Sequence, residues 1–204
     1  MVALVSRTGR QHQRYNLKGC RQVVGCIPYR YDDEDQLEVL VISSQKNHKM
    51  LFPKGGWEID ESMEEAALRE TLEEAGVTGE VKCKLGKWSF KSKRYDTFYE
   101  GYMFSLHVED ELESWAESHV RTRQWMTVKD AREICQHWWM KEALDVLTQR
   151  LSMSELEDDN VEEEDNVDNK EDDEDSPLED EDSPLEDEDS PLEDEDLSPR
   201  CMLS

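Results

Sequence analysis

The sequence predicts one α/β domain followed by a disordered acidic tail. Apolar segments of strand type alternate with segments of helical type along residues 21–151. The composition then changes abruptly near Leu151, and the heptapeptide SPLEDED occurs three times in succession after it. We therefore expect residues 1–151 to form the folded domain and residues 152–204 to form the tail.

The first two predicted strands are residues 21–30 and 37–43. Both segments are rich in β-branched residues, and the acidic residues 32–35 between them predict a turn. A proline and two glycines within residues 53–56 then predict a loop, because these residue types interrupt regular structure.

A helix is predicted to begin at about Met63 and to end before Gly76. Ser62 and Glu65 form a capping-box pattern, in which each side chain binds the backbone amide of the other residue. Apolar residues recur at helical spacing between these ends, and a glycine is the usual residue just after a helix.

Five further elements follow this helix. Residues 80–90 and 97–108 suit half-buried strands, and residues 121–126 form a short extended segment. Thr127 and Asp130 open another helix that runs to about Cys135. An amphipathic helix is predicted for residues 138–151.

Three glutamates of the first helix, Glu70, Glu73 and Glu74, lie on one face because their spacing is i, i+3, i+4. Like charges at this spacing destabilise a helix by about 0.2–0.5 kcal/mol per pair. A hard divalent cation would offset the repulsion, since such ions bind carboxylate oxygens. The alternative is a solvated acidic surface.

The residues around these glutamates resemble the signature of the Nudix hydrolases. Gly55 is followed after five residues by Glu61, and after seven more by the run RETLEEAGV at residues 69–77. Thr71 departs from the signature, where the family prefers an aliphatic residue, but a β-branched threonine can fill a buried position. The resemblance implies a Nudix fold, in which a mixed β-sheet is sandwiched between α-helices, and hydrolysis of a phosphate linked to a nucleoside diphosphate or another group.

The same resemblance implies roles for the residues of the signature. Glu70 and Glu74 are expected to be ligands of Mg²⁺ or Mn²⁺, and Glu73 to be the general base that takes a proton from the attacking water. Arg69 is expected to orient the carboxylates. The backbone at residues 54–56 is expected to face the metal and the substrate phosphate.

Outside the signature, the chain is similar to the diphosphoinositol polyphosphate phosphohydrolases and to the related enzymes that cleave diadenosine polyphosphates. The similarity extends over residues 14–150 and includes RQVVGCIPYR at 21–30 and ESWAESHVRTRQWMTVKDA at 113–131. FPKGGWE and HWWMKEAL most resemble the plant members. Lys54 stands where the animal members have a glycine, so the pocket is expected to differ there.

Basic residues bracket the predicted site and suit a polyphosphorylated small-molecule substrate, because arginine forks bind phosphate oxygens in pairs. The alternative is ordinary surface charge. The candidate substrate-binding residues are Arg21, Ser43, Lys54, Gly55, Gly56, Lys93, Arg94 and Arg121. Nothing resembles an aromatic platform beside a basic stripe, so we expect no nucleic-acid partner.

The predicted function is metal-dependent hydrolysis of a phosphoanhydride in inositol pyrophosphates, diadenosine polyphosphates or both. Two alternatives remain open. One is a Nudix-domain ligand sensor whose acidic tail binds basic partners. The other is a hydrolase of a different nucleoside diphosphate derivative.

The tail carries most of the charge of the chain. Residues 152–204 contain 26 acidic residues against Lys170 and Arg200, a net charge of −24 out of −27, which leaves only −3 on the domain. So few apolar residues cannot offset the entropy of ordering, and the prolines of the repeats exclude a continuous helix. We expect the tail to act as a solubilising segment, to bind basic partners or to occupy the active site of its own domain. The last four residues, from Cys201, fit a prenylation pattern that predicts a weak membrane tether.

The predicted location is cytoplasmic or nuclear, with the mitochondrion as the alternative. The five cysteines show no paired spacing, which favours a reducing compartment, and no apolar run is long enough for a membrane span. Residues 1–31 contain six Lys or Arg and no acid, as mitochondrial transit peptides do. They run directly into the first predicted strand, which favours their being part of the domain.

Overall fold

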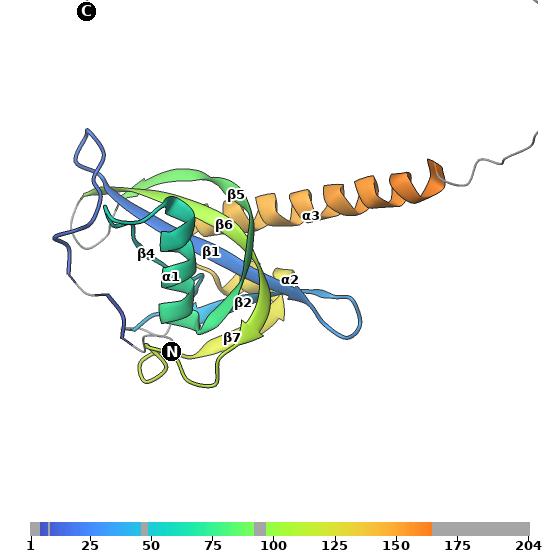
Figure 1. Ribbon diagram of the computed structural model, residues 1–204, viewed down its shortest axis with the longest axis horizontal. Helices are drawn as coiled ribbons and strands as arrows, with labels where there is room; N and C mark the ends of the chain where they lie inside the picture. Colours follow the sequence, from blue (N-terminus) through green and yellow to red (C-terminus); the bar gives the residue numbers. More distant parts are fainter. Residues whose placement is uncertain (1–4, 8, 46–48, 92–96, 165–204) are drawn as a thin grey trace, which may run out of the picture. The chain divides into compact units, whose positions relative to one another are not determined.

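The computed structural model describes residues 5–7, 9–45, 49–91 and 97–164, with side chains as far as Ser154 (Figure 1). Several predictions lie outside the described residues: the substrate-binding roles of Lys93 and Arg94, the disorder of the SPLEDED repeats, and the tether at Cys201. They stay predictions.

The described chain contains one seven-stranded mixed sheet. Strand β1 lies at its centre, parallel to β6 and antiparallel to β2 and β4, and the main path of the sheet runs in the order β3-β2-β1-β6-β5. Strand β7 pairs with β2. The strands are β1 (Arg21–Tyr31), β2 (Leu37–Ser43), β3 (Met50–Leu51), β4 (Lys54–Gly56), β5 (Val77–Lys91), β6 (Phe98–Glu111) and β7 (Arg123–Thr127).

Three helices cover the two faces of this sheet within the described residues. Helix α1 (Met63–Ala75) lies on one face, and α2 (Val128–Ile134) and α3 (Trp138–Glu164) lie on the other (Figure 1). The predicted α/β fold, with a mixed sheet between helices, is confirmed.

The core forms where β1 is buried by helices on both faces. Seven consecutive residues, Val23–Tyr29, are buried, as expected for a central strand. Thr71 of α1 is fully buried on the first face, where its hydroxyl donates to the carbonyl of Ala67 at 2.8 Å. The departure from the family signature at this position is therefore accommodated without an unpaired polar group.

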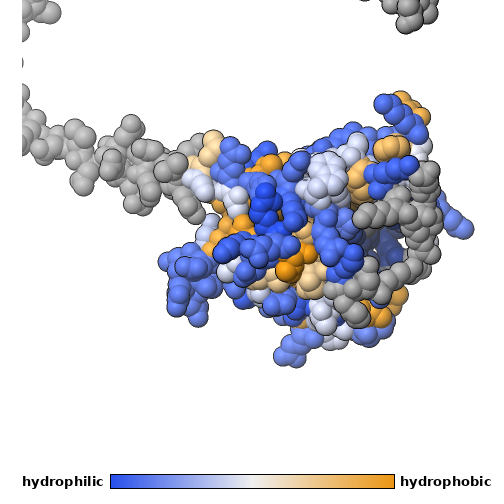
Figure 2. All heavy atoms as spheres, turned by 180° about the vertical axis from the view of Figure 1, so that it is seen from behind, coloured by the Kyte–Doolittle hydropathy of each residue, from blue (hydrophilic) through white to orange (hydrophobic). Residues whose placement is uncertain are grey.

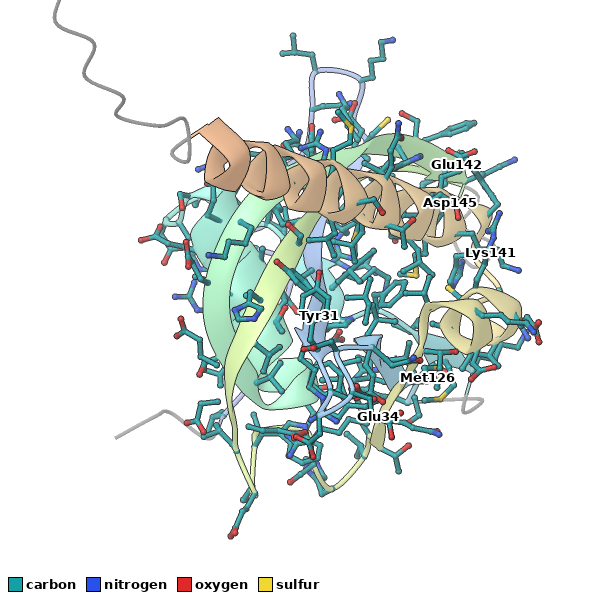
Figure 3. The ribbon with its side chains drawn as sticks, turned by 90° about the vertical axis from the view of Figure 1, so that its right-hand side faces the viewer. Tyr31, Glu34, Met126, Lys141, Glu142 and Asp145 are labelled. Carbon is teal, nitrogen blue, oxygen red and sulfur yellow. The ribbon has the colours of Figure 1, made fainter. Side chains whose placement is uncertain are left out.

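On the second face, the ring of Trp139 in α3 stacks on Phe90 of β5, with ring centroids 4.6 Å apart. Figure 3 shows α2 and α3 side by side over this face, with Asp145 on α3 and Met126 on β7. Seen from behind in Figure 2, the coloured residues are mostly hydrophilic, with small separated apolar patches. No helix in the described ranges is long and apolar enough to span a membrane.

Two differences from the predicted elements bear on the site and on the tail. The predicted loop at residues 53–56 contains β4, a strand that pairs with β1. Gly25 of β1 allows this close approach, because a Cβ there would stand 2.2 Å from the carbonyl oxygen of Pro53. Helix α3 continues past Leu151, where it was predicted to end, as far as Glu164. Leucine and glutamate have good helix propensity, and this outweighs the acidic composition over the first part of the predicted tail.

Candidate active site

Helix α1 begins and ends with the predicted caps. The hydroxyl of Ser62 accepts a hydrogen bond from the amide of Glu65 at 3.1 Å, and the Glu65 carboxylate accepts one from the amide of Ser62 at 2.7 Å. At the other end Gly76 has a φ of 66°, and Arg123 donates to the carbonyls of Ala75 and Gly76. The contacts at both ends fix the position of the helix. They therefore also fix the directions in which its glutamates point.

Arg69 joins this helix to the preceding loop. Its Nε and Nη2 donate to the two carboxylate oxygens of Glu61 at 2.8 and 2.7 Å, and Nη2 also donates to the carbonyl of Gly56 at 3.0 Å. Its Nη1 donates to Glu70 at 2.7 Å. Burial alone would raise the pKa of Glu61, but hydrogen bonds from Arg69 and from the amide of Glu58 outweigh it and lower that pKa. Arg69 thus joins the carboxylates of Glu61 and Glu70.

Glu70 lies against the backbone of Gly55. An ideal Cβ at Gly55 would stand 1.9 Å from Oε2 of Glu70, so only glycine leaves room for this carboxylate. Burial, followed by the nearby charge of Glu74, raises the pKa of Glu70 to about 7. The site therefore disfavours a negative charge on Glu70 while Glu74 is also charged, unless a cation is added.

Glu74 is bound on both carboxylate oxygens. The amide of Lys54 donates to Oε2 at 2.8 Å, and the guanidinium of Arg121 donates to Oε1. Arg121 also donates to Glu117 and, at 2.9 Å, to the carbonyl of Ser43. Burial raises the pKa of Glu74, while Lys54 and Arg121 oppose that shift. Arg121 therefore acts in the structure as the counter-ion of a signature glutamate.

Glu73 faces the N-terminal residues instead of the glycine loop. Its Oε2 accepts a hydrogen bond from the backbone amide of Arg7 at 3.2 Å, and its Oε1 lies 3.7 Å from Arg69. Burial raises the pKa of Glu73, against the lowering effect of the Arg7 amide. A carboxylate with a raised pKa is suited to accept a proton.

The glutamates fit part of a metal site. Over the described ranges, no group of three or more His, Cys, Asp or Glu side chains is arranged to hold a metal ion. Glu70 and Glu74 nevertheless lie one turn apart beside the glycine loop, and their mutual repulsion favours an added cation. Mg²⁺ needs only one or two protein carboxylates, because waters and substrate phosphates supply its other ligands.

Two other predicted substrate-binding residues, Arg21 and Ser43, lie in different surroundings. Arg21 lines a hollow of about 290 Å³, and a Cβ at Gly56 would stand 2.8 Å from its Nη2. The lining residues of this hollow, here called the basic pocket, are Arg10, Tyr15, Gly19, Arg21, Thr97 and Tyr99. Ser43 differs: only 2% of it is exposed, and its hydroxyl accepts from the amide of Thr122.

Three residues of the site had no role in the sequence analysis. Glu61 belongs to the signature, so its spacing was the signal that could have identified it as the partner of Arg69. Arg7 and Arg14 bind the loop before α1 across more than forty residues of sequence, and no local pattern indicates such contacts.

The model of the NUDIX domain matches residues 21–147, which include the glycine loop, α1 and Arg121. The chain belongs to the Nudix family. Nudix hydrolase 18, mitochondrial, of Arabidopsis thaliana is 62% identical over 173 residues, which cover 82% of this chain and 97% of the relative. At this identity the chain is a Nudix hydrolase, an enzyme that acts on phosphorus-containing anhydrides.

A more distant relative and a solved structure are also similar to this chain. Diphosphoinositol polyphosphate phosphohydrolase 3-alpha of Mus musculus is 34% identical over 128 residues, which cover 62% of this chain and 76% of the relative. The crystal structure of C. elegans Ap4A hydrolase superposes with a TM-score of 0.52 at 23% identity, over 65% of this chain and 98% of that one. The latter likeness shows the fold alone.

In this Nudix domain, the substitution Arg121→Gln is expected to lower the free energy of unfolding by about 3 kcal/mol, because it leaves the buried carboxylate of Glu74 without its counter-ion. Urea denaturation measures the change. The control is Arg132→Gln, which breaks an exposed ion pair with Asp145 and should change stability by less than about 1 kcal/mol (Figure 3). An Arg121→Gln variant with normal stability and a raised KM would instead support the predicted contact with substrate.

Proposed function

We propose that this enzyme is a metal-dependent hydrolase of a phosphoanhydride in a highly phosphorylated small molecule, either a diphosphoinositol polyphosphate, a diadenosine polyphosphate or both. The observation that carries the proposal is the position of the basic pocket. Arg21 connects the two parts of the site, because it lines this pocket and also lies against Gly56, next to the loop that faces Glu70. We propose that a chain of phosphates bound at the glutamates reaches this pocket.

The chemistry of the basic pocket suits several phosphates at once. It brings two guanidinium groups, of Arg10 and Arg21, together with the hydroxyl-bearing rings of Tyr15 and Tyr99. The guanidinium of Arg21 lies 5.6 Å from the ring centroid of Tyr99, and its Nε donates to Gln13 at 2.5 Å. These contacts hold Arg21 in a fixed direction, and a held arginine loses little entropy when it binds phosphate.

The proposed mechanism gives each glutamate one task. Nudix hydrolases generally use divalent metal ions such as Mg²⁺, which supply Lewis-acid stabilisation of phosphate oxygens. Glu70 and Glu74 would hold the ion, with Arg69 orienting Glu70. Glu73 removes the proton of the water that attacks phosphorus, and Lys54 to Gly56 present their backbone to the phosphate.

The identity of the substrate is supported by one relative. The mouse protein that is 34% identical over 128 residues is named for diphosphoinositol polyphosphates. The two candidate substrates share a run of phosphates joined by anhydride bonds, which is the feature that the basic pocket would bind.

The proposal is tested by phosphate release from an inositol pyrophosphate and from diadenosine hexaphosphate, with the full chain in Mg²⁺ or Mn²⁺. We expect turnover that stops when EDTA removes the metal. Arg21→Gln should raise KM by about tenfold, the effect of one lost charge-assisted contact of roughly 1.4 kcal/mol, with little change in kcat. Arg150→Gln, an exposed arginine of α3, is the control. Absence of turnover on both substrates would overturn the assignment in favour of another Nudix substrate or the sensor alternative.

For location, the name of the Arabidopsis relative contains the word mitochondrial, which supports the mitochondrial alternative over the cytoplasmic or nuclear prediction. We therefore propose the mitochondrion as the location to test first, by imaging of the full chain with a C-terminal tag.

A further inference from the structure

The segment just before β1 lies along the loop that precedes the catalytic helix. The amide of Arg14 donates to the carbonyl of Trp57 at 2.7 Å, and the amide of Ile59 donates to the carbonyl of His12 at 2.8 Å. An isolated bridge also joins Gln13 to Glu58. The loop at residues 57–61 is therefore paired with this segment on one side and joined to α1 on the other.

The side chain of Arg14 strengthens this pairing. Its Nε donates to the carbonyl of Glu58 at 2.9 Å, and its Nη2 donates to the carbonyls of Ile59 and Glu61 at 3.0 and 3.4 Å. Its guanidinium carbon stands 4.4 Å from the ring centroid of Trp57. One planar side chain thus binds three backbone carbonyls of the loop, a geometry that a lysine cannot reproduce.

The loop fixed in this way carries Glu61. The indole of Trp57 donates to the carbonyl of Glu61 at 3.1 Å, and the amide of Glu58 donates to its carboxylate at 3.0 Å. That carboxylate accepts two hydrogen bonds from Arg69, which in turn binds Glu70. A continuous series of contacts therefore leads from Arg14 through Glu61 and Arg69 to Glu70.

We propose that Arg14 is a positioning residue of the hydrolase: it fixes the loop at residues 57–61 so that Glu61 holds Arg69 in the direction that orients Glu70. Arg14 itself binds backbone carbonyls and an indole ring, so it acts through the loop and not on the substrate. The proposal rests on the proposed function of α1 for its kinetic part, and on the loop contacts alone for its structural part.

The test compares Arg14→Lys with Arg30→Lys in the full chain. Arg30 is a matched control, because it also lies 4.1 Å from a tryptophan ring, that of Trp125, and binds Glu38 through two nitrogens at the far end of β1. We expect Arg14→Lys to lower kcat at least tenfold with KM within about twofold of the native value, and Arg30→Lys to leave both within about twofold. Amide hydrogen exchange at residues 57–61 should become faster in Arg14→Lys alone.

A double-mutant cycle with Glu61→Gln gives the sharpest outcome. If Arg14 acts through Glu61, Arg14→Lys lowers kcat no further in the Glu61→Gln background. Three outcomes would overturn the proposal. The losses of kcat in the two single variants could add in the double variant, Arg14→Lys could change KM alone, or amide hydrogen exchange at residues 57–61 could stay at the native rate. If the native chain cleaves neither substrate, the exchange measurement still decides the positioning role, and the failure then belongs to the proposed function.

Discussion

Replacement of Glu73 by glutamine is expected to lower kcat by about a thousandfold, within the range that a general base contributes. Glutamine keeps the shape of the side chain and can still accept the hydrogen bond from the amide of Arg7, but it cannot take a proton from water. The measurement is the steady-state rate of phosphate release at saturating Mg²⁺, together with the thermal unfolding midpoint.

The control for this variant is Glu64→Gln, which removes a carboxylate from the exposed face of the same helix. It should change kcat by less than twofold. If Glu73→Gln retains turnover, Glu73 is not the proton acceptor, and the assignment of the general base is overturned. A biological interaction of the protein that Glu73→Gln leaves intact would favour the sensor alternative.

Gly55→Ala is expected to lower kcat by about a hundredfold while the protein stays folded. The added methyl group would meet the carboxylate of Glu70 at 1.9 to 2.2 Å, and no backbone atom is among the three atoms nearest to it. The end of the Glu70 side chain can rotate away from the added methyl group. We therefore expect the substitution to displace Glu70 more than it destabilises the fold. Displacement of a catalytic group by about 1 Å can cost a hundredfold in rate.

Gly56→Ala is the matched comparison for Gly55→Ala. Its methyl group would meet Gln13 and Arg21, the side of the site that faces the basic pocket. We expect Gly56→Ala to raise KM more than it lowers kcat, the reverse of Gly55→Ala. Equal effects of both variants on kcat and KM would contradict the assignment of the two glycines to different parts of the site. Circular dichroism of both variants verifies that they are folded.

The catalytic helix could be predicted from the sequence because its determinants are local. Ser62, Glu65 and Gly76 specify its ends within a few residues, and the spacing of Glu70, Glu73 and Glu74 places them on one side. The central strand could be predicted for the same reason, since an apolar run of this length suits a strand buried on both faces.

Other parts of the site depend on contacts between distant segments. Arg121 was predicted to bind substrate because of its charge, but its direction is decided by Glu74, 47 residues away in sequence. Ser43 lies at the end of β2, where it binds Thr122 just before β7, and the sequence does not show which strand pairs with which. Two adjacent glycines indicated a loop, whereas β1 supplies the partner that makes residues 54–56 a strand.

The pairing of residues 12–14 with the catalytic loop limits where a leader sequence could be removed. The residues up to 31 have the basic composition of an import signal, yet His12 and Arg14 already bind the backbone of Trp57 and Ile59. A processing protease that cut after Arg14 would leave a mature enzyme whose loop has lost its partner. If such a leader is removed, a cut that keeps all of these contacts must lie before Arg7, because the amide of Arg7 donates to Glu73.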